Sequence, residues 1–158
     1  MERFALEEVE TARGSPNLAG LVSSLHDFGE ALKWQEKLPS AARQFVEALR
    51  LSSQLRDPYA LGECLDALAD VSAMIGSHTE AANLWAKSDE LFRQAEAFSW
   101  DPRDAQLRVD ATRAVLGSDV FEEAWRAGRS MTLEHAITLA TAMADRVVQT
   151  SAAEGHEP

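Results

Sequence analysis

One pattern of apolar and small residues occurs twice in this chain, and the second copy follows the first at a constant distance of forty residues. Its members are Leu25, Phe28, Gly29, Ala41, Ala42, Phe45, Ala48 and Leu51 in the first copy, and Leu65, Leu68, Ala69, Ala81, Ala82, Trp85, Ser88 and Leu91 in the second. Each copy places a large and then a small residue on one helix, followed by Ala-x-x-x-aromatic on the next. Such a repeat is typical of solenoids built from helical hairpins. It predicts an architecture, whereas no stretch of the sequence identifies a substrate.

Turn signals divide the chain into two complete hairpins with flanking segments. Residues 17–55 form repeat 1 and residues 58–97 form repeat 2, in which Asp57 is the N-cap and Pro58 the first helical residue. Residues 1–14 are interpreted as part of a further hairpin, and residues 101–150 as capping helices opened by another Asp-Pro pair. We expect a single all-α domain over residues 1–150, a right-handed superhelix of about seven antiparallel helices, followed by a disordered tail over residues 151–158.

The repeat also predicts how the helices pack. Small residues such as Gly29 and Ala69 let the two helices of a hairpin approach closely, and large residues such as Phe45 and Trp85 fill the space between neighbours. The last helix begins at a cap formed by Thr132. Its residues spaced for one apolar face are Leu133, Ala136, Ile137, Ala140, Met143, Ala144 and Val147.

Acidic residues outnumber basic ones, with 26 Asp and Glu against 15 Lys and Arg, and the formal net charge is −11. A surface of this sign repels phosphate backbones and anionic lipid, so we expect neither a nucleic acid nor a membrane as a direct partner. No apolar run approaches the ~20 residues of a membrane span. The acidic amino terminus is unlike a secretory signal, so we expect a cytoplasmic location.

Few residues carry obvious chemistry. Cys64 is the single cysteine, which excludes an intrachain disulfide, and its helical neighbours favour a role in the core over that of a nucleophile. No two of the four histidines lie at metal-ligand spacing on one helix. We therefore expect no metal, no cofactor and no catalytic residue.

Set on the tetratricopeptide pattern, the first copy matches the signature positions in order. The matching residues are Leu25, Phe28, Gly29, Leu32, Ala41, Phe45 and Ala48, and in the second copy Leu65, Leu68, Ala69, Ala81, Trp85 and Ser88. The second copy departs at Ser72, where an aromatic residue is usual. The chain thus resembles a tetratricopeptide-repeat (TPR) protein, which implies a TPR-like superhelix. Its repeat exceeds the ~34 residues of the standard unit, and long repeats of this kind resemble the carboxy-terminal helical domain of MalT-like and LuxR-type bacterial regulators and ATPases.

A second resemblance lies between Leu116 and Ala136. This segment is similar to the closing segment of such regulators in actinobacteria, which commonly reads LG-x-x-x-F-x-x-A-W-x-x-G-R-x-[ML]-[ST]-L-E-x-A. The chain has no G-x-x-x-x-G-K-[ST] loop for a nucleotide and no helix-turn-helix pattern for DNA. The resemblance therefore implies the sensor or interaction end of a regulator in bacterial signal transduction. The parts of such regulators that hydrolyse ATP or bind DNA are absent from this sequence.

In TPR hairpins the first helix of each unit lines the concave surface, and this implies a set of partner-binding residues. The residues placed there are His26, Glu30, Lys33, Trp34, Glu63, Asp66, Asp70 and Met74. Four carboxylates predict a basic or amphipathic protein or peptide segment as the partner, with Trp34 and Met74 as apolar contacts. The alternative interpretation is that these carboxylates form an ordinary solvated face of an acidic protein.

Three further alternatives stay open from the sequence. A small-molecule sensor would use a cavity between repeat 2 and the cap, lined by Trp100 and Trp125. An unrecognised hydrolase would need a histidine near buried carboxylates. Finally, the apolar side of the first helix, formed by Phe4, Leu6 and Val9, lacks a preceding helix. We expect either a homodimer through this end or an exposed apolar patch there.

Overall fold

A computed structural model describes residues 2–14, 16–99 and 101–154, and within them the chain is all-helical, with eight α-helices and no strand. The helices are α1 (Glu2–Arg13), α2 (Leu18–Trp34), α3 (Leu38–Leu55), α4 (Pro58–Met74), α5 (His78–Gln94), α6 (Pro102–Leu116), α7 (Ser118–Ser130) and α8 (Leu133–Glu154). The prediction of about seven helices is one too low. The single residue Gly117, at φ 80°, separates α6 from α7, a conformation that glycine adopts without strain.

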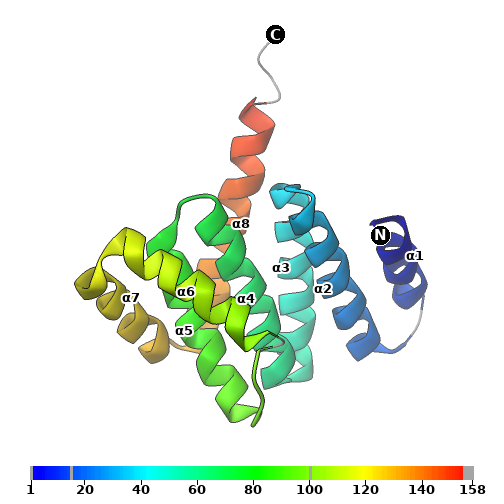
Figure 1. Cartoon of the computed structure of the whole chain (residues 1–158). Helices are drawn as coiled ribbons and strands as arrows, with labels where there is room; N and C mark the ends of the chain where they lie inside the picture. Colours follow the sequence, from blue (N-terminus) through cyan, green and yellow to red (C-terminus); the bar gives the residue numbers. More distant parts are fainter. Residues whose placement is uncertain (1, 15, 100, 155–158) are drawn as a thin grey trace.

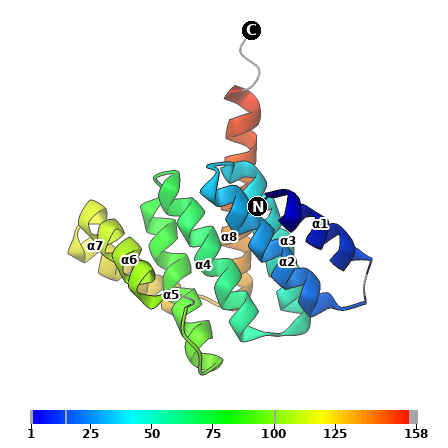
Figure 2. The ribbon, with the colours of Figure 1, turned by 45° about the vertical axis from the view of Figure 1, so that its right-hand side comes forward.

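Each helix from α1 to α6 packs against the next one along the chain, and α7 also packs on α5. The most extensive contacts join α2 to α3 and α4 to α5. The last helix, α8, turns back and contacts α3, α4 and α5. In Figure 1 it lies behind these helices, whereas α6 crosses in front of α4 and α5. The carboxy-terminal part of α8 extends past the ends of the other helices in both views (Figures 1 and 2).

The helix starts follow from capping side chains. Oδ1 of Asp57 accepts hydrogen bonds from the backbone N–H groups of Tyr59 and Ala60, at 3.0 and 3.3 Å, and Pro58 fills the first helical position. Asp101 caps α6 in the same way, so both predicted Asp-Pro starts are confirmed. Asn17 caps α2 at the position equivalent to Asp57, which extends the forty-residue repeat to the helix ends.

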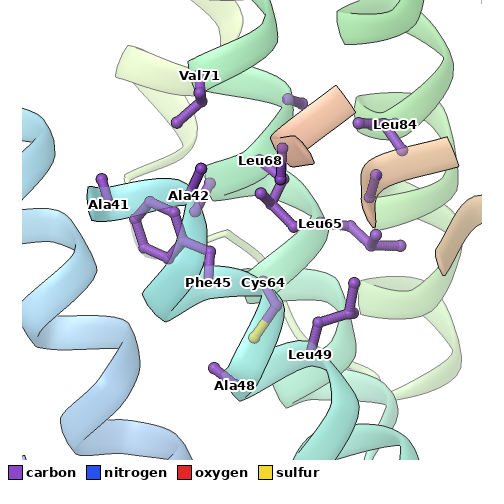
Figure 3. Packing of buried hydrophobic residues seen from close by; sticks show 14 of the residues in the cluster. Ala41, Ala42, Phe45, Ala48, Leu49, Cys64, Leu65, Leu68, Val71 and Leu84 are labelled. Atoms are coloured by element: carbon purple, nitrogen blue, oxygen red, sulfur yellow. The ribbon is translucent and has the colours of Figure 1, made fainter. Parts of the chain in front are cut away.

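The core lies between α2, α3, α4, α5 and α8, and Figure 3 shows Phe45 of α3 among its buried neighbours. The close approach expected at Gly29 is confirmed. The side chain of Phe45 is fully buried, and a Cβ built on Gly29 would lie only 2.4 Å from its ring. No residue larger than glycine fits this place without a shift, because real Cβ atoms do not approach so closely. Gly29 thus lets α2 rest directly on the aromatic ring of α3.

The face of α8 that contacts the core is the predicted one. Ala136, Ala140, Met143, Ala144 and Val147 are all buried, and the helix continues to Glu154. Residues 151–154, assigned from the sequence to a disordered tail, therefore belong to α8, and residues 155–158 lie outside the described part of the chain. Over the residues that are described, no helix combines the length and apolar character needed to cross a bilayer.

The first helix differs from expectation at one residue. Val9 is buried, with 3% of its surface exposed, because Val9 and Ala5 point toward the side of α1 that packs on α2. Phe4 and Leu6 are exposed at 75% and 42%. The apolar surface left without a neighbour on α1 is thus formed by Phe4 and Leu6, and the inclusion of Val9 in it was wrong.

Candidate functional site

The eight residues predicted to bind a partner lie on two helices that touch one another. His26, Glu30, Lys33 and Trp34 belong to α2, while Glu63, Asp66, Asp70 and Met74 belong to α4. The two helices are joined directly by Lys33, whose Nζ lies 2.8 Å from Oδ2 of Asp70 and 2.8 Å from Oε1 of Glu30. We call these eight residues the charged face.

A residue from a third helix, Arg108 of α6, also belongs to this cluster. Its guanidinium pairs with Asp70, lies 3.4 Å from Oδ2 of Asp66 and places Nε 3.0 Å from Oδ2 of Asp104. It also stands over the ring of Trp85, with Cζ 5.9 Å from the ring centroid. The sequence signal was limited to the i,i+4 pair of Asp104 with Arg108, which predicts nothing about α4.

These contacts neutralise part of the acidity predicted for the charged face. Asp70 is buried and accepts from both Lys33 and Arg108. Burial raises the pKa of Asp66, although Arg108 and Lys33 act in the opposite direction. Asp66 and Asp70 therefore hold α2, α4 and α6 together, while Glu30 and Glu63 remain half-buried at the surface.

His26, Glu63 and Tyr59 form a second group at the other end of the charged face. Burial lowers the pKa of His26, but the hydrogen bond to Asp27 and the carboxylates of Glu63 and Glu30 raise it more, so the net direction is upward. Burial raises the pKa of Glu63, partly offset by His26 and by a hydrogen bond from Tyr59. None of the carboxylates that act on His26 is fully buried, so this geometry does not build a dry acid–base pair.

Two apolar side chains stand at equivalent places beside these charges. Trp34 ends α2 and Met74 ends α4, and the two are forty residues apart, in the same register as the repeat. Trp34 is 82% exposed and Met74 is 51% exposed. Both side chains are therefore accessible to solvent at the carboxy-terminal ends of neighbouring helices.

Replacing Arg108 by Leu should loosen α6. Apart from Arg108, α6 buries little of its surface. Thr112 is its one buried residue, and Leu107 and Val115 are 69% and 64% exposed. Removing a partly exposed, charge-assisted contact costs about 1–2 kcal/mol. Amide hydrogen exchange should therefore become faster in residues 102–116 and stay nearly unchanged in α3.

The matched control for this prediction is Arg103→Leu, which removes the same charge from an exposed position of the same helix. Equal exchange rates in α6 for the Arg108→Leu and Arg103→Leu variants would contradict the role of Arg108 as the residue that fixes α6 on α4.

The structure places the residues of the alternative interpretations as follows. Cys64 is buried, with Sγ 3.9 Å from Oγ of Ser52, and burial raises the pKa of its thiol to about 12, which disfavours a reactive thiolate. Trp125 stacks on Phe121, with ring centroids 5.4 Å apart, whereas Trp100 lies outside the described residues. In the described ranges no group of three or more His, Cys, Asp or Glu residues is arranged to hold a metal ion.

Comparison with known proteins finds relatives among bacterial regulators. Over 105 residues the chain is 28% identical to "Putative HTH-type transcriptional regulator" proteins of Mycobacterium bovis and of two strains of Mycobacterium tuberculosis. The match covers 65% of this chain and 12% of the length of each relative. No protein-family profile matches the chain, and no solved structure matches it. The chain is therefore distantly similar to a small part of proteins named as transcriptional regulators.

Proposed function

We propose that this chain is a non-catalytic, TPR-like interaction module of bacterial transcriptional regulation, and that its charged face binds a basic or amphipathic segment of a protein partner. Support for the regulatory role comes from the relatives named as transcriptional regulators. The forty-residue repeat and the paired packing of α2 with α3 and of α4 with α5 support the TPR-like arrangement.

The observation that carries the proposal is the repeated composition of one face. Trp34 and Met74 occupy equivalent positions of the two repeats and are both exposed. Each of the same two helices also carries a half-buried carboxylate, Glu30 on α2 and Glu63 on α4, so carboxylates and exposed apolar side chains occur together on α2 and α4. Such a surface complements a helix or extended segment that alternates apolar and basic side chains.

Arg108 decides which carboxylates a partner would use. Asp66 and Asp70 already hold the guanidinium of Arg108 from α6, so their charges are largely satisfied. The ammonium of Lys33 is shared by Asp70 and Glu30, at 2.8 Å from each. Glu30 and Glu63 are the half-buried carboxylates of the charged face that remain outside the Arg108 contacts. We therefore assign the attraction for a basic partner to Glu30 and Glu63, and the apolar contact to Trp34 and Met74.

The test is a titration with a labelled amphipathic peptide of about 18 residues, long enough to form a helix, with leucine on one face and arginine on the other. We expect Glu30→Gln/Glu63→Gln to weaken binding by about fivefold or more and to flatten its salt dependence, since two attractive charges are lost. The matched control is Glu123→Gln/Glu134→Gln, which removes the same charge from exposed positions of α7 and α8. Equal affinities of the wild type and the Glu30→Gln/Glu63→Gln variant would refute the proposal.

A further inference from the structure

The edge of the molecule formed by α1 and α2 carries an open groove of about 430 Å³. Its walls come from Phe4, Glu8 and Ala12 of α1, from Gly20 and Ser24 of α2, and from Asn17, the N-cap of α2. The groove and the charged face share helix α2, but none of the eight residues of the charged face lines the groove. The groove is therefore a second surface, separate from the one to which the proposed function is assigned.

The forty-residue repeat relates this groove to a place between α3 and α4, which is covered by other helices. The pair α3 and α4 corresponds to α1 and α2, and two helices, α2 and α8, lie against both α3 and α4. Ser24 corresponds to Cys64 in the repeat, and Cys64 is 1% exposed whereas Ser24 lines the open groove. Among the described residues, no helix packs on both α1 and α2 as α2 and α8 pack on both α3 and α4. The groove thus has the form of a binding site for one more helix.

The lining of the groove indicates the chemistry of that helix. Ala12, Gly20 and Ser24 are small, and a Cβ added to Gly20 would meet only the flexible side chain of Asn17. Small residues permit a close helix-to-helix approach. Glu8 adds a carboxylate to the rim, next to Glu7, which is already paired with Arg3 at 3.2 Å. Phe4, 75% exposed, offers an aromatic contact at one end.

We infer that the α1–α2 groove binds an amphipathic helix of a partner protein, with Ala, Gly or Ser on its contact side and Lys or Arg beside them. A second copy of this chain fits the groove less well. The helix α1 carries four glutamates against two arginines, and the whole chain has a net charge of −11, so two copies would bring like charges together. A basic helix gains from the same carboxylates.

The experiment uses the full chain and a labelled peptide of about 18 residues with alanine and serine on one helical face and lysine on both flanks. Glu8→Lys reverses a rim charge and should weaken binding by about fivefold to tenfold. Glu10→Lys makes the same change on an exposed position of α1 outside the groove and should change affinity by less than about twofold.

Three results would overturn this inference. The first is the absence of saturable peptide binding, and the second is equal loss of affinity in Glu8→Lys and Glu10→Lys. The third is a concentration-dependent dimer in sedimentation that Glu8→Lys dissociates, because it would make the occupant a second copy. Loss of binding in Glu30→Gln/Glu63→Gln but not in Glu8→Lys would place the peptide on the charged face and would likewise refute the groove, leaving the proposed function intact.

Discussion

Replacing Phe45 by Ala should lower the free energy of unfolding by about 3–5 kcal/mol, the usual cost of deleting a buried aromatic ring. The ring is fully buried and lies against Gly29, where α2 rests on α3. It also lies 5.6 Å from the His26 ring, centroid to centroid, and its centroid is 6.0 Å from Nζ of Lys33. Deleting the ring therefore removes the packing contact beneath His26 and Lys33 of the charged face, and it also leaves a cavity in the core. Denaturant unfolding of the full chain measures the effect.

Two further variants make this prediction specific. Phe98→Ala removes the same ring from a position that is 82% exposed and should change stability by less than about 0.5 kcal/mol. Gly29→Ala should be strongly destabilising alone, yet cost less in the Phe45→Ala background, because the deleted ring leaves room for the methyl group. Additive effects of Gly29→Ala and Phe45→Ala would contradict direct packing between these residues.

Replacing Gly128 by Ala should destabilise the carboxy-terminal part of the chain by about 2–3 kcal/mol, within the range of overpacking. A Cβ on Gly128 would lie 2.2 Å from the backbone oxygen of Asn83 and 2.7 Å from its Cα. The backbone of α5 cannot swing aside as a side chain can, so α7 must move away. Phe121 and Ala124, which pack against Ala82, would lose their contacts.

Gly14→Ala is the control for Gly128→Ala, since a Cβ on Gly14 would make an ordinary contact at 3.5 Å with the carbonyl oxygen of Thr11. We expect its stability to stay within about 0.5 kcal/mol of the wild type. Unfolding monitored by tryptophan fluorescence would report the change, because Trp125 lies on α7 beside Phe121. Equal stability of the Gly14→Ala and Gly128→Ala variants would show that α7 does not pack closely on α5.

The helices and the packing within each hairpin were predictable because both depend on the residue types and spacings of the repeat. Large and small residues at fixed spacing place Phe45 opposite Gly29, and Asp-Pro pairs place the starts of α4 and α6. The spacing along α8 likewise identified its buried face. At Ser72, where the repeat lacks the usual aromatic residue, the hydroxyl is fully buried and donates to the Ser77 carbonyl at 3.0 Å.

Contacts between distant segments could not be predicted in this way. The sequence gives Arg108 no sign that its partners are Asp66 and Asp70, because helical periodicity carries no information on which helices meet. For the same reason the apolar face of α8 was visible, but its position against α3, α4 and α5 was not. Nor did the sequence show that Arg108 reaches the carboxylates of the charged face from α6.

The most direct test of the central claim is to locate where the leucine–arginine peptide binds, by amide hydrogen exchange of the full chain with and without the peptide. Binding at the charged face predicts slower exchange in residues 26–34 and 63–74, with little change in α3 and α8, and loss of this protection in Glu30→Gln/Glu63→Gln. Protection confined to α3 and α8, or unchanged exchange at saturating peptide, would contradict it.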